Sequence, residues 1–217
     1  MFDIFSREGL IAFLYTLPAL VLSLSIHEYA HAWVAYKLGD ISQKIRGRLT
    51  LNPLAHIDPI GFIAIMLIGV GWGKPVTVDD RNFKDSRKGM MLTALAGPTS
   101  NLILAIVVTI LLKVLYTVGA IEAMSASNIG NITINMLMTL ISFNVIFCVF
   151  NLIPLPPLDG SKVLSYFLPQ RARGFMYTLE RYSFIIILFI YFTNITTYLI
   201  RPGYNLILKL LNWIMNL

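Results

Sequence analysis

Long apolar runs separated by short polar stretches dominate the pattern along this 217-residue chain. Runs of membrane-spanning length cover residues 9–38, 89–118, 132–153 and 183–200. A helix needs about 20 mainly apolar residues to cross the roughly 30 Å hydrocarbon core of a bilayer. The composition agrees, since only 13% of the residues are charged, against about 25% in a soluble domain. The pattern therefore predicts an all-α membrane protein, built as a polytopic helical bundle.

Two further apolar runs are shorter, and they leave the number of transmembrane segments at about five to six. Residues 60–72 are too few and too rich in glycine for a clear span, so we expect this run to re-enter the membrane or to lie on its surface. Residues 204–217 form either an interfacial amphipathic helix or a short sixth segment, and the sequence does not separate these two alternatives.

The stretch between the first and third long runs favours extended structure. KIRGRLTLN at residues 44–52 alternates polar and apolar positions, and KPVTV at residues 74–78 does so briefly. We therefore expect a small re-entrant β-hairpin region. A sheet edge at membrane depth needs protein or water around it, so this region also predicts a cavity.

Basic residues indicate the orientation of the chain. They cluster after the first, second and fourth runs, whereas the loop at residues 119–131 has none. The clusters are Lys37, Lys44, Arg46 and Arg48; Lys74, Arg81, Lys84, Arg87 and Lys88; and Lys162, Arg171, Arg173 and Arg181. Because basic loops stay on the cytosolic side, all three clusters are expected there. The net charge of +6 thus reports membrane orientation, and we expect no nucleic-acid partner.

The first run ends in SIHEYAHAW, which places three ionisable side chains at membrane depth. His27 and His31 are four residues apart and share one helix face, where two imidazoles can hold one metal ion. Glu28 beside them can act as a general base, as in the H-E-x-x-H arrangement. The alternative is a purely structural role, in which the two imidazoles form hydrogen bonds to neighbouring helices. Ionisable residues inside a membrane usually serve a function, which favours the metal site.

A catalytic zinc ion takes three protein ligands and keeps one open position, so a third ligand is needed. His56 and Asp159 are the candidates. Asp159 follows the proline-broken stretch NLIPLPPLDG at the end of the fourth run, which returns to the side where the first run ends. The alternative for Asp159 is an N-cap of a helix over residues 160–168, because aspartate caps helices well.

Three short elements together resemble the signature motifs of the site-2 protease family of intramembrane zinc metalloproteases. They are HEYAH at residues 27–31, GPTSN at residues 97–101 and NLIPLPPLDG at residues 151–160. Two more stretches, LNPLAHIDPIG and GWGKPV, resemble the small bacterial and archaeal members that lack PDZ and CBS domains. The resemblance runs from about residue 20 to residue 170.

The resemblance implies a role for five residues. His27, His31 and Asp159 match the zinc ligands of the family, and Glu28 matches its catalytic base. Asn151 matches the asparagine that opens the aspartate motif and is thought to contact the substrate or the oxyanion. One zinc ion per chain is the implied cofactor.

Three other residues are candidates for substrate contact or for support of the site. His56 lies between prolines and is favoured as a local turn histidine. Gly97 permits close helix packing, which explains it without a catalytic role. Asn101 is polar in an apolar run and is expected to bond across helices.

The expected protein is a multi-pass cell-membrane protease with its active site toward the cytosol. It would cleave peptide bonds in or near the transmembrane helix of a protein substrate within the lipid bilayer. We expect a single domain over residues 1–217, with a catalytic core over about 9–170 and C-terminal helices over about 173–217. A metal-ion transporter and a non-catalytic helix-binding pseudo-protease are the alternatives. The sequence does not fix the oligomeric state.

Overall fold

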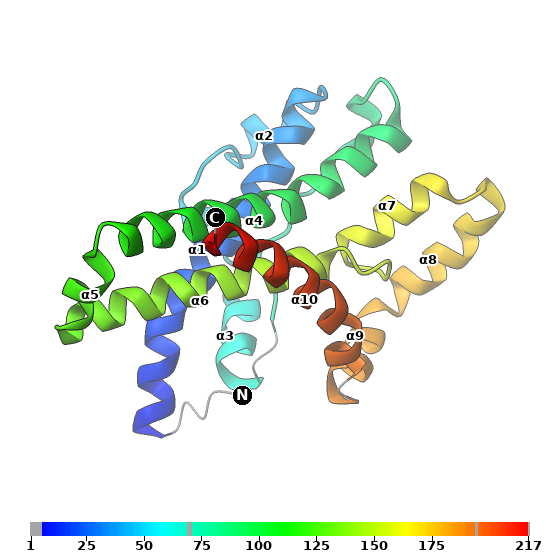
Figure 1. The fold of residues 1–217 in the computed structure, drawn as a ribbon. Helices are drawn as coiled ribbons and strands as arrows, with labels where there is room; N and C mark the ends of the chain where they lie inside the picture. The colour runs from blue at the N-terminus through cyan, green and yellow to red at the C-terminus, as the bar shows by residue number, and fades with distance from the viewer. Residues whose placement is uncertain (1–5, 69–70, 194, 217) are drawn as a thin grey trace.

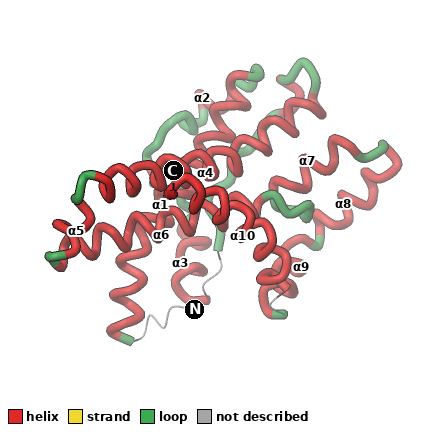
Figure 2. The backbone as a smooth tube through the Cα atoms, in the orientation of Figure 1, coloured by secondary structure: helices red, strands yellow, loops and turns green. Residues whose placement is uncertain are grey.

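The computed structural model describes residues 6–68, 71–193 and 195–216, and there the chain consists of helices and connecting loops (Figures 1 and 2). The α-helices are α1 (Arg7–Lys37), α2 (Ser42–Ile45), α3 (Pro59–Ile68), α4 (Ser86–Thr117), α5 (Ala120–Ser125), α6 (Asn128–Asn151), α7 (Asp159–Phe167), α8 (Arg173–Arg181), α9 (Ser183–Phe192) and α10 (Ile195–Asn216). Short 3-10 turns are η1 (Pro53–Ala55), η2 (Asp80–Asn82) and η3 (Gln170–Ala172).

Helix α4 is the centre of the fold. It packs against α1, α6 and α7, and α1 also packs against α6 (Figure 1). Both α4 and α6 are long and apolar enough to cross a membrane. Together with the helical content, these helices agree with the predicted all-α membrane protein.

The hydrophobic core lies where α1, α4, α6 and α10 meet. Its buried members are Ala19, Ala105, Val108, Leu112, Leu140, Ile141, Val145 and Leu211. Helix α10 is fastened at its C-terminal end by the ammonium group of Lys113, which donates to the Ile214 carbonyl oxygen at 3.0 Å. A cation at this end also meets the negative end of the helix dipole. Since α10 also packs against α6, the C-terminal helix is docked on both long helices.

The boundaries of the C-terminal helices differ from the predicted ones. The apolar run at residues 183–200 is not one helix, because α9 ends at Phe192 and α10 begins at Ile195. Helix α10 then continues through Pro202 to Asn216, so the tail predicted at residues 204–217 is not a separate element.

Helix α3 occupies the short run that was expected to re-enter the membrane or to lie on its surface. Its ten residues correspond to about 15 Å of helix, roughly half of the hydrocarbon core. Residues 69 and 70 of this run lie outside the described residues, so its re-entry into the membrane or position on the surface stays a prediction.

The predicted β-hairpin is wrong for the residues that the structure describes. Its two segments, 44–52 and 74–78, contain no strand, and the β-bridge described nearby joins Ile57 to Gly73, outside both segments. Side chains donate hydrogen bonds to the carbonyl groups that would otherwise accept from a neighbouring strand. Arg48 donates to the carbonyl oxygens of Lys74 and Pro75 at 3.3 and 3.1 Å. The alternating pattern therefore gives no paired strands: residues 44 and 45 belong to α2, and residues 74–78 belong to no helix or strand.

Asp40 fastens the loop after α1 to the loop before α4. Its fully buried carboxylate accepts hydrogen bonds from Ser42 N at 3.1 Å, Gln43 Nε2 at 2.7 Å, Asp79 N at 3.0 Å and Asn82 Nδ2 at 3.1 Å. Burial alone would raise the pKa of Asp40, but the hydrogen bonds from Ser42, Asp79 and Gln43 outweigh it and lower the pKa below its ordinary value. The ionised form is thus the one that the fold binds.

Asp40→Asn is expected to destabilise the protein at neutral pH by about 2 kcal/mol, the usual worth of hydrogen bonds to a charged group. Because the pKa of Asp40 is lowered on folding, its stabilisation is present above the ordinary value of about 3.9 and is lost as the pH falls toward the folded value. Thermal unfolding of both proteins should therefore differ at pH 7 and converge below about pH 4. A difference in melting temperature that stays constant down to pH 3 would contradict this account of Asp40.

Candidate metal centre

Two imidazoles from α1 and one carboxylate from the first residue of α7 meet in the interior of the protein. The Nε2 atoms of His27 and His31 are 3.0 Å apart, and Asp159 Oδ2 lies 3.2 Å from the first and 3.1 Å from the second. Each of the three residues is at most 8% exposed. The convergence that the spacing and the chain topology suggested is therefore present.

The outer nitrogen of His27 is held by a chain of buried amides. His27 Nδ1 lies 2.7 Å from Asn101 Oδ1, and Asn101 Nδ2 donates to the Ser23 carbonyl oxygen and to Asn144 Oδ1 at 3.1 and 2.8 Å. Asn144 Nδ2 in turn donates to the Leu140 carbonyl oxygen at 2.8 Å. Since both carbonyl oxygens can only accept, both amides are fixed in orientation. His27 Nδ1 must therefore carry the proton, which leaves a lone pair on Nε2.

His31 is oriented in the same sense by the backbone. Its Nδ1 lies 2.7 Å from the Thr93 carbonyl oxygen in α4, which can only accept. Nδ1 must donate, so His31 Nε2 also presents a lone pair. A histidine whose outer nitrogen donates to a fixed acceptor is the usual arrangement in a metal site.

The three facing atoms fit a divalent cation. Two imidazole lone pairs and a carboxylate oxygen meet with no hydrogen between them, and Asp159 Oδ2 is buried without a hydrogen-bond partner. Such an arrangement of acceptors is unfavourable unless a cation joins them. Two histidines and a carboxylate are also a donor set that zinc accepts in catalytic sites.

Gly97 makes room for the two imidazoles on the face of α4. A Cβ atom at this position would overlap the imidazole rings of His31 and His27. The small residue was predicted to permit helix packing, and what packs against it is the candidate metal centre itself. The position therefore excludes every side chain while both rings stay in place.

Glu28 is buried beside the two histidines in α1. Its Oε2 atom accepts a hydrogen bond from the backbone N–H of Val76 at 3.0 Å. Val76 lies in the unpaired stretch before α4, so the carboxylate is held by a part of the chain far away in sequence. The residue is therefore placed next to the candidate metal centre and fixed in orientation.

Asn151 and His56 are bonded elsewhere. Asn151 is the last residue of α6, and its Nδ2 donates to the Phe147 carbonyl oxygen of the same helix at 3.1 Å. His56 is fully buried, and its Nε2 lies 2.7 Å from the Thr50 carbonyl oxygen. Of the two candidates for the third ligand, only Asp159 therefore meets the pair of histidines.

The N-cap alternative for Asp159 is wrong. The N-cap of α7 is Leu158, which makes no side-chain cap, and Asp159 is the first residue of the helix. Its carboxylate turns toward the two imidazoles instead.

Three contacts of the site were not predicted. They are the Thr93 carbonyl group, the Val76 N–H group and the Asn144 amide that fixes Asn101. Two of them are backbone groups, which every residue carries, so no sequence signal marks them. Asn144 offered a signal as a polar residue in an apolar run, but one sequence cannot say which neighbour it meets.

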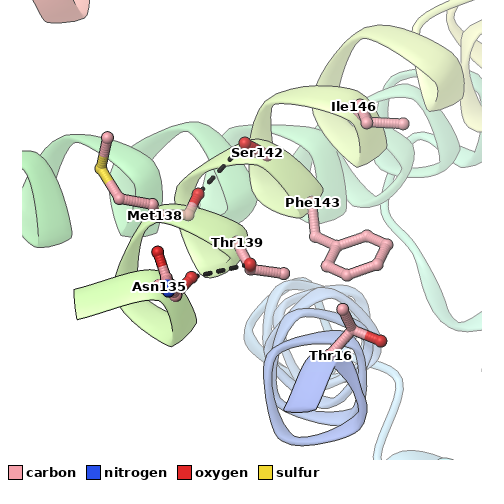
Figure 3. A pocket seen from close by; sticks show the side chains of 7 residues that line it. All are labelled: Thr16, Asn135, Met138, Thr139, Ser142, Phe143 and Ile146. Carbon is pink, nitrogen blue, oxygen red and sulfur yellow. Dashed lines mark hydrogen bonds between the residues drawn. The ribbon is translucent and has the colours of Figure 1, made fainter. Parts of the chain in front are cut away.

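A groove between α1 and α6 is separate from this centre (Figure 3). It encloses about 410 Å³ and is lined by Thr16, Asn135, Met138, Thr139, Ser142, Phe143 and Ile146. The hydroxyl groups of Thr139 and Ser142 donate to the carbonyl oxygens of Asn135 and Met138 in their own helix. None of the candidate site residues lines the groove.

The chain is similar to a known protein family and to several named proteins. The sequence model described as peptidase family M50 matches residues 15–193. The chain is 40% identical to "Putative zinc metalloprotease YwhC" of Bacillus subtilis (strain 168), over 88% of this chain and 86% of that protein. It is 26% identical to "Putative zinc metalloprotease Rip2" of Mycolicibacterium smegmatis, over 83% and 68% of the two chains, and 28% identical to the Rip2 protein of Mycobacterium tuberculosis (strain ATCC 25618 / H37Rv), over 82% and 67%. No solved structure matches the chain.

Proposed function

Because this chain belongs to peptidase family M50 and is an intramembrane zinc metalloprotease, we propose that His27, His31 and Asp159 hold its zinc ion and that Glu28 is its general base. The observation that carries the proposal is the buried meeting of two imidazole lone pairs and one carboxylate oxygen, 3.0 to 3.2 Å apart. A purely structural pair of histidines would instead be expected to have a hydrogen bond at every inner nitrogen.

The zinc ion and the residues around it would have separate roles in peptide hydrolysis. When bound, a zinc ion with three protein ligands and an open position lowers the pKa of a water molecule and polarises a carbonyl group. Glu28 takes the proton from the attacking water and later gives it to the leaving amine. Val76 N–H holds Glu28 Oε2, which leaves Oε1 to take up the proton.

Asn151 is proposed to stabilise the oxyanion that forms on the scissile carbonyl. Its position in the motif supports this role, and its Nδ2 atom can donate once it turns away from the Phe147 carbonyl oxygen. Loss of such a donor commonly lowers the rate by about a hundredfold. The contact seen with Phe147 is thus a resting position, which substrate binding would exchange.

The substrate is proposed to be a transmembrane helix of another protein, cut in or near its membrane segment. Proteases of this family act on membrane-protein substrates. A peptide bond inside a helix has its carbonyl group in a hydrogen bond, so the substrate must unwind locally before it is cut. The high burial of the three proposed ligands supports a site that only an unwound segment can enter.

The proposed topology places the metal centre in the cytosolic half of the bilayer. Of the five to six membrane segments expected, α1, α4 and α6 are each long enough to cross alone, α9 and α10 supply the C-terminal part, and α3 re-enters. Basic residues lie beyond the C-terminal end of α1 and at the N-terminal end of α4, which supports a cytosolic position for these ends. The chain is proposed to form one domain over residues 1–217, with a catalytic core over about 9–170.

Asn101→Leu is expected to weaken zinc binding by about 10- to 100-fold, the usual effect of losing a group that orients a metal-bound histidine. The variant removes the acceptor that fixes the proton on His27 Nδ1. Competition with a zinc chelator of known affinity measures the change. Asn135→Leu is the matched control, since it replaces an exposed amide in α6 that is not among the candidate site residues. Equal zinc affinity in both variants would contradict the role of Asn101.

Comparative membrane proteomics tests the function. Cells with the wild-type protein and cells with Glu28→Gln are compared for single-pass membrane proteins that accumulate uncut. We expect a small set of such proteins in the variant, with the matching fragments present only beside the wild type. Identical membrane proteomes in the two cells would argue against a protease.

A further inference from the structure

The group that orients the proposed base belongs to a segment without regular structure. Val76, whose N–H bonds Glu28, lies 48 positions further along the chain. The segment 73–76 belongs to no helix or strand. Gly73, its first residue, forms an isolated β-bridge with Ile57. The place of this N–H group therefore depends on whatever fastens the segment 73–76.

The segment 73–76 is fastened on two sides. The backbone N–H of Lys74 donates to the His56 carbonyl oxygen at 2.8 Å. At Gly73 a Cβ atom would come within 2.9 Å of a methyl group of Leu24, so the segment lies directly against α1, one turn before Glu28. These contacts involve Gly73 and the N–H of Lys74, and neither reaches the carbonyl groups of Lys74 and Pro75.

Arg48 fixes the peptides on either side of Pro75. Its guanidinium donates to the carbonyl oxygens of Lys74 at 3.3 Å and Pro75 at 3.1 Å, and also to that of Ala55 at 2.5 Å. The Pro75 carbonyl group belongs to the same peptide as the Val76 N–H. Arg48 therefore holds the peptide whose other end holds Glu28.

The buried environment of Arg48 raises the free energy of its charged guanidinium group. The residue is only 9% exposed, and the ion pairs of the described residues give it no carboxylate partner. A buried charge bonded to neutral carbonyl groups is less stable than one with a counter-ion. Arg46, two positions earlier, bonds the Thr77 carbonyl oxygen but is exposed, as surface arginines usually are. The burial of Arg48 therefore needs a reason beyond fastening a loop.

We infer that Arg48 is a positioning residue for the proposed general base, acting through the Pro75–Val76 peptide on the carboxylate of Glu28. This inference rests on the proposed role of Glu28 as the base. The hydrogen bonds of Arg48 go to Ala55, Lys74 and Pro75 and reach none of the three proposed ligands, so its loss should lower the rate of proton transfer and leave zinc binding intact.

Arg48→Ala tests this, with Arg46→Ala as the matched control. The probe is the single-pass protein that accumulates most beside Glu28→Gln, purified with its membrane segment in dodecyl maltoside micelles. Arg48→Ala should lower kcat by about tenfold, because small displacements of a catalytic group cost up to a hundredfold. KM and zinc content should stay as in the wild type. Arg46→Ala should stay within about twofold of the wild type.

A double variant separates positioning from a general effect on the fold. Because Val76→Pro removes the N–H group itself, Arg48→Ala should lower kcat no further in that background. Arg48→Lys, which keeps the charge, replaces Arg48→Ala in the same cycle if the alanine variant does not fold. The inference would be overturned if the losses of kcat in Arg48→Ala and Val76→Pro multiplied in the double variant. It would also be overturned if Arg48→Ala changed only KM or zinc content, or if its kcat equalled that of Arg46→Ala. If Glu28→Gln itself cleaved normally, the proposed function would fail instead.

Discussion

Gly97→Ala is expected to abolish zinc binding and cleavage although it adds a single methyl group. The new Cβ atom would overlap the imidazole rings of His31 and His27, so both rings must move. The rings cannot move without breaking their bonds to the Thr93 carbonyl oxygen and to Asn101 Oδ1. The variant therefore loses the two imidazole donors together.

The fold itself should survive this change. The atoms that the methyl group meets are side-chain atoms that can rotate, rather than backbone atoms. We therefore expect zinc content near zero by elemental analysis, with helical circular dichroism as in the wild type. Gly174→Ala is the control, because its Cβ would meet nothing within 4 Å in α8. Full zinc content in Gly97→Ala would show that the imidazoles do not hold the metal where the geometry places them.

Glu28→Gln is expected to lower kcat by about a hundred- to ten-thousand-fold, the usual contribution of a general base. Glutamine keeps the size of the side chain and can still accept the hydrogen bond from Val76 N–H, so orientation and packing are preserved. What it loses is the ability to take up a proton. Zinc content should remain one per chain, because Glu28 is not among the three proposed ligands.

The kinetic experiment uses the substrate found by membrane proteomics. Glu122→Gln is the matched control, since it removes an exposed carboxylate in α5 and should leave kcat unchanged. A Glu28→Gln protein that retains a tenth or more of the wild-type kcat would exclude Glu28 as the base. Loss of zinc together with activity would indicate that Glu28 acts on the metal rather than on the proton.

Local periodicity predicted the part of the site that lies within one helix. The four-residue spacing of His27 and His31 requires a shared face in any α-helix, and their ring centroids are 4.6 Å apart. The long helices α4 and α6 follow from the apolar runs for the same reason. Such features depend only on neighbours in sequence, which a single sequence contains.

The third proposed ligand required information from outside its own neighbourhood. The residues around Asp159 fit an N-cap as well as a ligand, and the choice depends on α4 packing against both α1 and α7, with the first residue of α7 meeting His27 and His31. Chain direction and the family resemblance supplied that choice before the geometry did. Local sequence alone left the two alternatives open.

The β-hairpin shows where alternation of polar and apolar residues misleads. A strand needs a partner for its carbonyl groups, and in this chain buried or nearby side chains bond them first. Gln43 and Arg46 both donate to the Thr77 carbonyl oxygen, and Arg48 occupies those of Lys74 and Pro75. The pattern of the sequence does not reveal these side-chain partners, and it also misses that residues 44 and 45 belong to α2.

The most direct test of the central claim is X-ray absorption at the zinc edge, recorded on the wild-type protein and on Asp159→Ala. The account predicts two imidazole nitrogens and one carboxylate oxygen at about 2.0 to 2.2 Å from zinc in the wild type. In the variant the carboxylate contribution should disappear and zinc should bind more weakly. A wild-type spectrum with fewer than two imidazole nitrogens, or a spectrum that Asp159→Ala leaves unchanged, would contradict it.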